Sequence, residues 1–448
     1  TPASGHDPAR TATEWRYYDE AGNLIASIDP RGTALLDEYS DGLTAATDYR
    51  TLHWYDGLGR LTDTFDPLGQ RTHTEYDAYG NARFVTDSWG ATTEYIYDAL
   101  SRLTRTLDAT DEHYVTEVDY AVAGVAGTVR EVTDALDRVT RYTYDGEGRL
   151  IQTDYADGGQ TRCSFDAAGN LETVTVLRSA GGAGAASVEI VTRHSYDAGN
   201  RLTQTVEAFG TLEAVTTVEN VYNAAGNLRL VGDPRGDAYV TEYAYDALNR
   251  VVSIRRPTGT TDHPTYATET FTYDEAGNVI AYSDLRGEFD ETLMAYDGAG
   301  RLVRREQPSG LPGEPETQVE TFAYDLVGNL LEYAVPTRLR TNAAGDLVPV
   351  TTTYVYDALG RPVVITDAEG GITLTVFPLD RNEMHVYDAR AGGVEDERYL
   401  TVHEYDVMGR LVRRVSPAGP LDGTPERVTE LFVYDAVGNL IAVVDGRA

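Results

Sequence analysis

A tyrosine-aspartate motif recurs along almost the whole chain and limits what the chain can fold into. Ten segments fit the pattern Tyr-Asp-x-x-Gly-(Asn/Arg), and five more differ from it by one step. Self-similarity at a short period is the sequence signature of repeat architectures, in which each unit packs only on its neighbours. The sequence therefore predicts one continuous array of about 15 repeats.

The motif places a tyrosine, an aspartate and, in the full form, a glycine at fixed spacing, and we predict a structural role for all of them. The full motifs contain Tyr18, Asp19 and Gly22; Tyr55, Asp56 and Gly59; Tyr76, Asp77 and Gly80; Tyr144, Asp145 and Gly148; Tyr273, Asp274 and Gly277; Tyr296, Asp297 and Gly300; Tyr324, Asp325 and Gly328; Tyr356, Asp357 and Gly360; Tyr405, Asp406 and Gly409; Tyr434, Asp435 and Gly438. Among the variants, Tyr97-Asp98 carries Ser101 and Tyr245-Asp246 carries Asn249 in place of the glycine, and Tyr196-Asp197 is interpreted as one residue short. Phe165 replaces the tyrosine in another, and Tyr222 is followed by Asn223.

A second turn separates successive motifs. It often reads Asp-x-x-Gly, as at Asp29–Gly32, Asp66–Gly69, Asp87–Gly90 and Asp367–Gly370, and the shortest repeat is 21 residues long. Such a unit holds two strands of about five to seven residues and two tight turns, which is the size of a β-hairpin. An aspartate at the turn start accepts backbone N–H groups, and glycine supplies the positive φ of a type I turn closed by a bulge. Asn249 tolerates that conformation, whereas Ser101 should be mildly strained.

The strand before each motif alternates, as in Tyr142-Thr143-Tyr144 and Tyr354-Val355-Tyr356. Side chains two residues apart share a face of a sheet, so these aromatic pairs lie on one side and should meet tyrosines of neighbouring strands. The predicted fold is all-β, a repeat array of antiparallel β-hairpins in a curved, spiralling sheet that forms part of a hollow shell or barrel. Almost no helix is expected, because no window shows a capped 3.6-residue period.

The array is expected to run continuously over residues 15–448. Residues 1–14 precede the pattern and are interpreted as a linker or a frayed terminus. Turn-forming insertions near 179–187, 306–318, 337–350 and 415–427 should be loops at hairpin tips, where added length has little thermodynamic cost. The degraded motif at 387–393 predicts an irregular or longer hairpin. Because the first residue is Thr1 and no signal peptide is visible, we expect the chain to be part of a longer protein.

Charge excludes several classes of partner. The formal net charge is −35, so phosphate backbones and anionic lipid surfaces should repel the chain, and we expect no nucleic-acid binding. No apolar run reaches the roughly 18 residues of a spanning helix, so no membrane insertion is expected from this segment. Cys163 is the only cysteine, which rules out an intrachain disulfide.

The residues offer weak candidates for chemistry, and we predict no catalytic, cofactor-binding or metal-binding residues. The acidic residues recur at turn positions, which turn capping explains better than a glycosidase pair. The eight histidines show no metal-ligand spacing, and no Ca²⁺ loop of the EF-hand type occurs. Cys163 is expected to be a buried thiol and not a nucleophile. The single region that could hide a hydrolase is Phe377 to Glu397, with His385 and Asp388.

The motif Tyr-Asp-x-x-Gly-(Asn/Arg)-Leu with its Asp-x-x-Gly companion resembles the RHS, or YD, repeat over about residues 15 to 445. That family includes bacterial Rhs polymorphic toxins, wall-associated proteins, the B and C components of insecticidal toxin complexes, and teneurins. The resemblance implies a hollow shell, which encloses a toxic C-terminal polypeptide in the toxins and supports cell adhesion in teneurins. Toxin-bearing members cleave themselves at an Asp-Pro-x-Gly segment. Here such segments, as at Asp66-Pro67-Leu68-Gly69, lie inside ordinary repeats, so self-cleavage is not assigned.

Two functions therefore follow from the resemblance as expectations. The first is a structural wall of a larger secreted or cell-surface protein, part of a shell that encapsulates a C-terminal toxin or effector. Its partner would be the remainder of the parent polypeptide. The alternative is an adhesion stalk that binds a cell-surface receptor or a glycan through the loops near Gly181, Gly310 and Gly419.

Overall fold

The computed structural model describes residues 13–33, 49–110, 115–120, 128–178, 188–232, 239–258, 265–284, 291–308, 317–341, 346–393, 395–418 and 426–446. The chain forms two compact units. One combines residues 1–116 with 319–448, and the other is 117–318. The predicted insertion 179–187 and most of those at 306–318 and 415–427 lie outside the described residues, as do residues 1–12 of the predicted linker.

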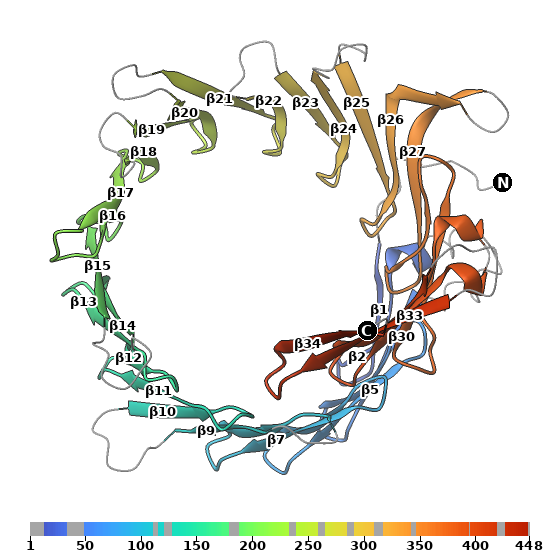
Figure 1. Cartoon of the computed structure of the whole chain (residues 1–448), viewed down its shortest axis with the longest axis horizontal. Helices are drawn as coiled ribbons and strands as arrows, with labels where there is room; N and C mark the ends of the chain where they lie inside the picture. Colours follow the sequence, from blue (N-terminus) through green and yellow to red (C-terminus); the bar gives the residue numbers. More distant parts are fainter. Residues whose placement is uncertain are drawn as a thin grey trace. The chain divides into compact units, whose positions relative to one another are not determined.

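The described segments contain 34 strands, and every pairing found between them is antiparallel and joins strands that follow one another along the chain (Figure 1). The first unit opens with β1 (Trp15–Tyr18), β2 (Leu24–Ile28), β3 (Arg50–Tyr55), β4 (Leu61–Phe65), β5 (Arg71–Tyr76), β6 (Ala82–Thr86), β7 (Thr92–Tyr97) and β8 (Leu103–Leu107). Its second half holds β25 (Thr317–Tyr324), β26 (Leu330–Thr341), β27 (Leu347–Tyr356), β28 (Pro362–Thr366), β29 (Ile372–Val376), β30 (Glu383–Tyr387), η3 (Ala389–Ala391), η4 (Glu397–Tyr399), β31 (Leu400–Tyr405), β32 (Leu411–Ala418), β33 (Glu426–Tyr434) and β34 (Leu440–Asp445).

The second unit is a single meander that follows a curved strip in Figure 1. It begins within β9 (Val115–Asp119) and continues through β10 (Thr128–Thr133), β11 (Val139–Tyr144), β12 (Leu150–Asp154), β13 (Gln160–Phe165), β14 (Leu171–Arg178), β15 (Val188–Tyr196), β16 (Leu202–Glu207), β17 (Val215–Tyr222), β18 (Leu228–Gly232), β19 (Thr241–Tyr245), β20 (Val251–Pro257), β21 (Tyr266–Tyr273), β22 (Val279–Ser283), β23 (Glu291–Tyr296) and β24 (Leu302–Pro308). The predicted all-β array of antiparallel hairpins is confirmed.

Every hairpin built on the motif contains the predicted bulge. Strand pairing shifts by one residue just before each motif aromatic, for example between Trp54 and Tyr55 and between Ser164 and Phe165. All 15 motifs, the five variants included, show this shift. A bulge increases local twist and re-aims the side chain that follows it. The same turn therefore directs each motif aromatic in the same way.

The register between successive hairpins is also constant. In each hairpin, take the residue two positions after the first apolar residue of the second strand. It pairs with the residue three before the next motif aromatic or, after β28, three before Phe377. The pairs are Ala26–Leu52, Asp63–His73, Phe84–Glu94, Gln152–Arg162, Thr173–Arg193, Gln204–Glu219, Leu230–Glu242, Ser253–Thr270, Ala281–Leu293, Glu332–Thr353, Val364–Leu374 and Arg413–Leu431.

This register does not depend on the length of the connection. The paired residues are 10 apart in sequence at Asp63 and His73 (73 − 63) and 26 apart at Ala26 and Leu52 (52 − 26). Within a hairpin, turn length normally sets the register. Contacts between the strands must therefore set the register between hairpins.

Two sequence expectations need correction. Residues 337–341 and 347–350 of the expected loop continue strands β26 and β27, so the insertion lengthens a hairpin. The expected turn Asp29–Gly32 is a single turn of helix at 30–33, in which Thr33 N–H donates to the Asp29 carbonyl at 3.1 Å. Asp66-Pro67 forms the ordinary turn, so proline alone does not cause the difference. Arg31 instead stabilises the helical turn, because it donates to the carbonyls of Asp357 at 3.1 Å and Ala358 at 2.8 Å.

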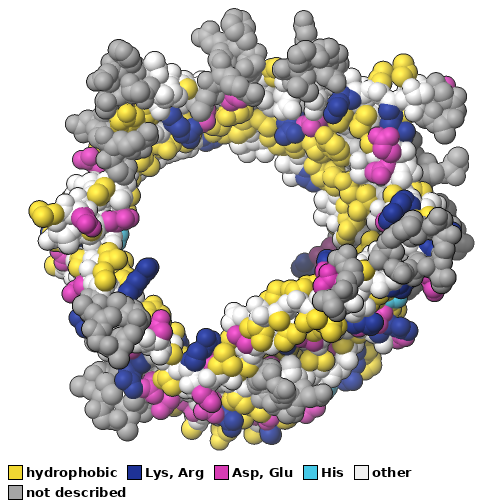
Figure 2. Space-filling model, viewed as in Figure 1, with side chains coloured by type: hydrophobic (Ala, Val, Ile, Leu, Met, Phe, Trp, Pro, Cys, Tyr) yellow, Lys and Arg dark blue, Asp and Glu magenta, His cyan; other side chains and the backbone are white. Residues whose placement is uncertain are grey.

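Few side chains in the described segments are buried, as expected for a sheet with water on both faces. Only nine hydrophobic residues in the described segments are buried, and no large side chain there is fully enclosed. Figure 2 shows hydrophobic side chains reaching the surface among acidic and arginine side chains. Turn and cross-strand contacts must therefore carry much of the stability.

Candidate functional site

The motif aspartate closes each turn through both carboxylate oxygens. Asp56 Oδ1 accepts the backbone N–H of Leu58 at 2.9 Å and of Arg60 at 3.0 Å, while Oδ2 accepts Nε–H of Arg60 at 2.7 Å. The Asp56 carbonyl accepts the Gly59 N–H at 3.0 Å, and the Asp56 N–H donates to the Arg60 carbonyl at 2.9 Å. Five hydrogen bonds form within five residues, which explains why Asp and the final Arg or Asn recur together.

The fourth turn residue has a positive φ in full and variant motifs alike. Gly59 has φ +76°, and Ser101 and Asn249 adopt the same region at 58° and 62°. Asn200 is the informative case, because its φ is 59° and its N–H donates to the Asp197 carbonyl at 3.0 Å. The prediction that the Tyr196 motif lacks a residue is therefore wrong. Asn200 takes the glycine position, and Gly199 lies one place earlier.

Eight of the motif tyrosines join their hairpin to the one before it. Tyr76 donates its hydroxyl to the Leu61 carbonyl at 2.7 Å, and that leucine is the first apolar residue after the preceding motif. The same hydrogen bond joins Tyr55 to Leu24, Tyr196 to Leu171, Tyr222 to Leu202, Tyr245 to Leu228, Tyr273 to Val251, Tyr356 to Leu330 and Tyr434 to Leu411, at 2.7 to 3.0 Å. These bonds cross the junctions whose register is constant.

Where a motif ends in arginine, the guanidinium stacks on the aromatic ring of the next repeat. The Arg60 guanidinium lies 4.6 Å from the ring centre of Tyr76, and its Nη1 donates to the Asp77 carbonyl at 3.3 Å. Matching stacks are Arg149 on Phe165, Arg201 on Tyr222, Arg250 on Tyr273, Arg361 on Phe377 and Arg410 on Tyr434. The expected contact of motif tyrosines with each other across strands is therefore replaced by Arg–Tyr stacking where an arginine ends the motif. Tyr354 and Tyr356 do stack along one strand, with ring centres 6.5 Å apart.

We predict that the Tyr76→Phe variant is less stable by about 1 kcal/mol, because the Leu61 carbonyl loses its donor while the ring stays in place. Tyr79 in the same repeat is 82% exposed and is the matched control. Its phenylalanine variant should change the unfolding free energy by less than about 0.5 kcal/mol in urea denaturation. Equal losses from the two variants would contradict a role for the inter-hairpin hydrogen bond.

The turn geometry lowers the pKa of many motif carboxyls. For Asp56, the backbone N–H of Arg60 and then its side chain lower the pKa, and for Asp77 the Asn81 side chain is the main cause. The pKa values of Asp98, Asp145, Asp197, Asp246 and Asp274 are lowered in the same way. A carboxyl with a depressed folded pKa stabilises the fold above its unfolded pKa of about 3.9, and this stability is lost as pH falls through the folded value.

We therefore expect the midpoint of thermal unfolding to fall steeply below about pH 4, measured by circular dichroism between pH 7 and pH 3. Added salt should leave this fall in place, since it screens distant charges more than short hydrogen bonds. Protonation also relieves repulsion in a chain with net charge −35. A midpoint that kept rising to pH 3 would show that repulsion outweighs the turn bonds.

The residues considered for chemistry have structural partners. His385 Nε2 lies 2.7 Å from Glu383 Oε2, whereas Asp388 caps η3 by accepting the Arg390 N–H at 2.9 Å. Cys163 is half-buried and not fully buried as expected, and this partial burial raises the pKa of its thiol, which disfavours the reactive thiolate. In the described segments, no three His, Cys, Asp or Glu side chains come together as a metal site. No helix of the described residues is long and apolar enough to cross a membrane.

The region from Phe377 to Glu397 is irregular, but it is packed. The helical turns η3 and η4 lie between β30 and β31, where other repeats have a tight turn. Tyr387, Ala391 and Leu400 form a buried cluster there, and Leu374 and Val402 pack against it. Within the described chain this is the one cluster of buried hydrophobic residues. The irregular segment therefore adds a small hydrophobic core to the sheet.

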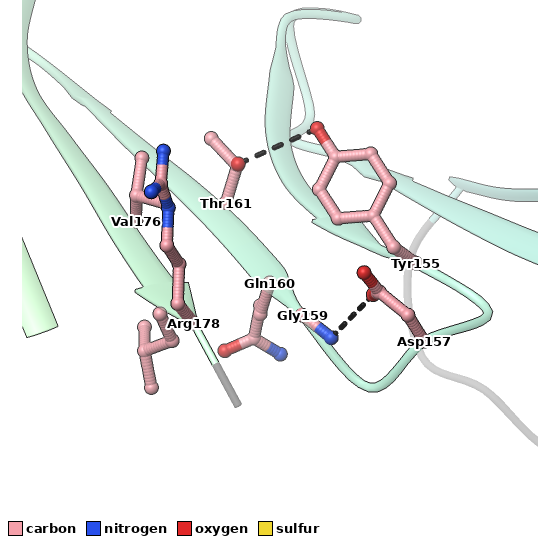
Figure 3. A pocket seen from close by; sticks show the side chains of 8 residues that line it. Tyr155, Asp157, Gly159, Gln160, Thr161, Val176 and Arg178 are labelled. Atoms are coloured by element: carbon pink, nitrogen blue, oxygen red, sulfur yellow. Dashed lines mark hydrogen bonds between the residues drawn. The ribbon is translucent and has the colours of Figure 1, made fainter. Parts of the chain in front are cut away.

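A shallow groove lies where one turn departs from the repeat rule (Figure 3). Tyr155 stands in the position usually held by Asp, and Gly158 N–H still donates to its carbonyl at 3.0 Å. The freed Tyr155 side chain is 47% exposed and faces Thr161 across the groove, with its hydroxyl 3.4 Å from Thr161 Oγ1. Asp157, Gln160 and Arg178 also line this groove, whose volume is about 610 Å³. Tyr155 breaks the turn pattern in the sequence, which is the signal by which this groove could have been recognised.

Comparison with known proteins identifies similar repeats in toxins. The Teneurin YD-shell family model matches residues 183–392, and the RHS repeat model matches residues 125–160. A segment covering 49% of this chain is 28% identical to part of double-stranded DNA deaminase toxin A of Burkholderia cenocepacia (strain H111). Another covering 36% is 28% identical to part of the probable deoxyribonuclease RhsB of Dickeya dadantii (strain 3937).

These relatives are much longer proteins. The aligned segments span 17% and 11% of the two toxins. In the crystal structure of TcdB2-TccC3-Cdc42, 96% of this chain superimposes on 23% of the solved chain, with a TM-score of 0.69 and 16% identity. At that identity the likeness establishes a shared fold.

Proposed function

Because this chain belongs to the RHS/YD-repeat family, we propose that it is a section of a shell wall that encloses a toxin or effector polypeptide of the same parent protein. The observation that carries the proposal is the constant register between hairpins, which lets many repeats extend one sheet in the same direction. The names of the relatives, a deaminase toxin and a probable deoxyribonuclease, support a toxic cargo. On this proposal the parent is a secreted or surface protein.

In this proposal the wall spans residues 15–448 and residues 1–14 lead into it. The motif tyrosines, aspartates and glycines hold the wall together, and no residue of this segment catalyses a reaction. The remainder of the parent polypeptide is the partner, as further repeats and as cargo. The aligned segments span only 17% and 11% of the two toxins, which supports separate wall and cargo regions in one parent protein.

The proposal is tested by protease protection in the parent protein. The segment downstream of the wall should resist a protease that digests the same segment expressed alone. A wall variant that opens hairpins, such as Tyr76→Ala, should expose it, whereas Tyr79→Ala should not. Digestion of the segment at the same rate with and without the wall would overturn encapsulation.

We also propose carbohydrate binding as a second candidate, because the groove at Tyr155 favours it. An exposed aromatic ring offers a stacking face, and Asp157, Gln160 and Arg178 offer polar groups for hydroxyls. The volume of about 610 Å³ is within the usual range for small-ligand sites. The loops near Gly181, Gly310 and Gly419, expected from the sequence to contact a glycan, lie outside the described residues.

A glycan array probed with the whole chain tests this candidate. Binding that is lost in Tyr155→Ala and kept in Tyr79→Ala would support it, since both tyrosines are exposed turn residues. Binding that is unaffected by Tyr155→Ala, or absent altogether, would remove the groove as a glycan site. Neither result bears on encapsulation.

A further inference from the structure

The last residue of the motif is arginine in some repeats and asparagine in others. Where it is Arg60, its Nε–H donates to Asp56 and its guanidinium stacks on Tyr76 in the next hairpin. Its Nη1 also donates to the carbonyl of Asp77 at 3.3 Å, and Arg250 makes the matching bond to the next motif aspartate at 3.1 Å. We call the space between one motif aspartate and the aromatic ring and aspartate carbonyl of the next motif the arginine slot. A motif that ends in arginine fills its own slot.

The first motif ends in Asn23, whose side chain is shorter than that of arginine. Its backbone N–H and its side-chain amide both donate to the carboxylate of Asp19, each at 2.8 Å, so the side chain is held at its own turn. A hollow of about 810 Å³ lies at this junction, and Tyr55, Asp56 and Trp54 are among the residues that line it together with Asn23. The arginine slot of this junction is therefore open.

Two hairpins that the structure describes border this hollow. Trp15 pairs with Ile28, and Ile28 pairs with Arg50, at one end of the strands β1, β2 and β3. The motif turns and the hollow lie at the other end. The stretches 1–12 and 34–48, which are outside the described residues, join the chain at the ends away from the hollow. The hollow is thus a feature of the junction between these two hairpins.

An arginine from a distant segment reaches the arginine slot of another asparagine-ended junction. Asn329 ends the motif that precedes Tyr356 and Asp357. At this junction, Arg31 donates Nη1 to the Asp357 carbonyl at 3.1 Å and Nη2 to the Ala358 carbonyl at 2.8 Å. The bond to the motif aspartate carbonyl is the one that a motif arginine makes at other junctions. Both segments belong to the first unit, so a slot left by asparagine accepts an arginine from elsewhere in the chain.

The turn that carries Arg31 holds its guanidinium in place for this contact. Nε and Nη2 of Arg31 donate to Asp29 Oδ2 at 3.1 and 2.6 Å, and the guanidinium lies 4.9 Å from the ring centre of Tyr49. Burial alone would lower the pKa of Arg31, but the hydrogen bond and charge of Asp29, followed by the charge of Asp325, raise it. The remaining N–H groups of this charged, oriented guanidinium bind the two carbonyls.

The described chain holds two more turns of the form Asp-x-Arg. Arg390 and Arg398 make the same fork onto Asp388 and Asp396. The side chains of these two arginines are 63% and 53% exposed. A guanidinium presented by an Asp-x-Arg turn is therefore a recurring element of this chain.

We propose that the open slot at Asn23, Tyr55 and Asp56 binds the guanidinium of an arginine in an Asp-x-Arg turn of another segment of the parent polypeptide. The guanidinium stacks on the Tyr55 ring and donates to the Asp56 carbonyl, which accepts the Gly59 N–H at 3.0 Å and has a second lone pair. The carboxylates of Asp19 and Asp56 border the slot and favour a cation. The site is independent of any cargo or glycan.

Two capped peptides with sequences from this chain test the ligand. They are Asp-Pro-Arg-Gly, as at 29–32, and Asp-Pro-Leu-Gly, as at 66–69. The whole chain is used in a Trp15→Phe, Trp89→Phe background, so that Trp54 in the hollow is the single tryptophan. The arginine peptide should change the Trp54 fluorescence with saturation. Its affinity should be at least about tenfold higher than that of the leucine peptide, because only the guanidinium supplies charged donors.

The variant Asn23→Arg tests the slot itself. It supplies a guanidinium from the first motif, which should stack on Tyr55 as Arg60 stacks on Tyr76, and the affinity for the arginine peptide should fall at least about tenfold. Circular dichroism should show the same fold for this variant, with a thermal midpoint equal to or above that of the parent. Asn278→Arg makes the same change at a junction in the other unit and should leave the Trp54 response unchanged.

Three results would overturn the proposal. They are equal affinity for the two peptides, no response of Trp54 to the arginine peptide up to its solubility, and full binding of that peptide to Asn23→Arg. None of these results bears on encapsulation or on the groove at Tyr155.

Discussion

The Leu400→Ala variant should lower the free energy of unfolding by about 2 to 4 kcal/mol, because a buried leucine is lost and its cavity is only partly filled. Leu400 is 8% exposed and packs in the cluster with Tyr387 and Ala391. Most other leucines in the described sheet have one side in water. The loss should therefore be among the largest for any single leucine in the chain.

The measurement is chemical denaturation, combined with hydrogen exchange of the backbone amides in β30 and β31. Local exchange is needed because repeat arrays can unfold in parts. Leu379→Ala is the control, since Leu379 lies in the same irregular region and is 55% exposed. Its effect should stay below about 0.5 kcal/mol. Similar effects from the two variants would mean that the cluster does not act as a core.

The turns could be predicted from the sequence because their chemistry is local. An aspartate acceptor and a residue that tolerates positive φ lie three positions apart, so both can be recognised in one short window. The same locality caused the error at Asn200. Gly199 resembles the motif glycine, but spacing from Asp197 gives the left-handed position to Asn200, and the asparagine tolerates it.

Contacts between hairpins were harder to predict. Arg60 and Tyr76 are each obvious in their own motif, but their stacking joins residues 16 positions apart (76 − 60) in different hairpins. Alternation shows which face a side chain occupies and does not show what it meets. The tyrosine hydroxyl bond to a backbone carbonyl was missed for the same reason, since every residue has a carbonyl and sequence cannot single one out.

The irregular segment at 387–393 shows a further limit. The degraded motif indicated that the hairpin changes there, but the core was not foreseen. Tyr387 is a motif-like aromatic that became part of the cluster, and Ala391 and Leu400 join it across two helical turns. Their burial depends on packing between segments that have no shared period.

The two glycines of one turn should respond to alanine with opposite signs. Gly59 has φ +76°, so a side chain there is strained, and Gly59→Ala should cost about 1 to 2 kcal/mol. At Gly57, no neighbouring atom lies within 4 Å of an added Cβ, and φ is not in the positive range. Gly57→Ala should therefore stabilise the fold by about 0.4 to 1 kcal/mol, because it restricts the unfolded chain.

The variant Gly59→Asn shows whether the positive φ, and not the absence of a side chain, is the reason for glycine at this position. Gly59→Asn should be milder than Gly59→Ala, because Asn200 and Asn249 already occupy this position in other repeats at φ 59° and 62°. The order of stability expected in urea denaturation is Gly57→Ala, wild type, Gly59→Asn, Gly59→Ala. If both alanine variants were equally destabilised, the positive φ would not be the constraint. The repeated glycine would then need another explanation, such as close contact with the preceding turn, where Asn23 Oδ1 lies 3.7 Å from the Cβ position of residue 59.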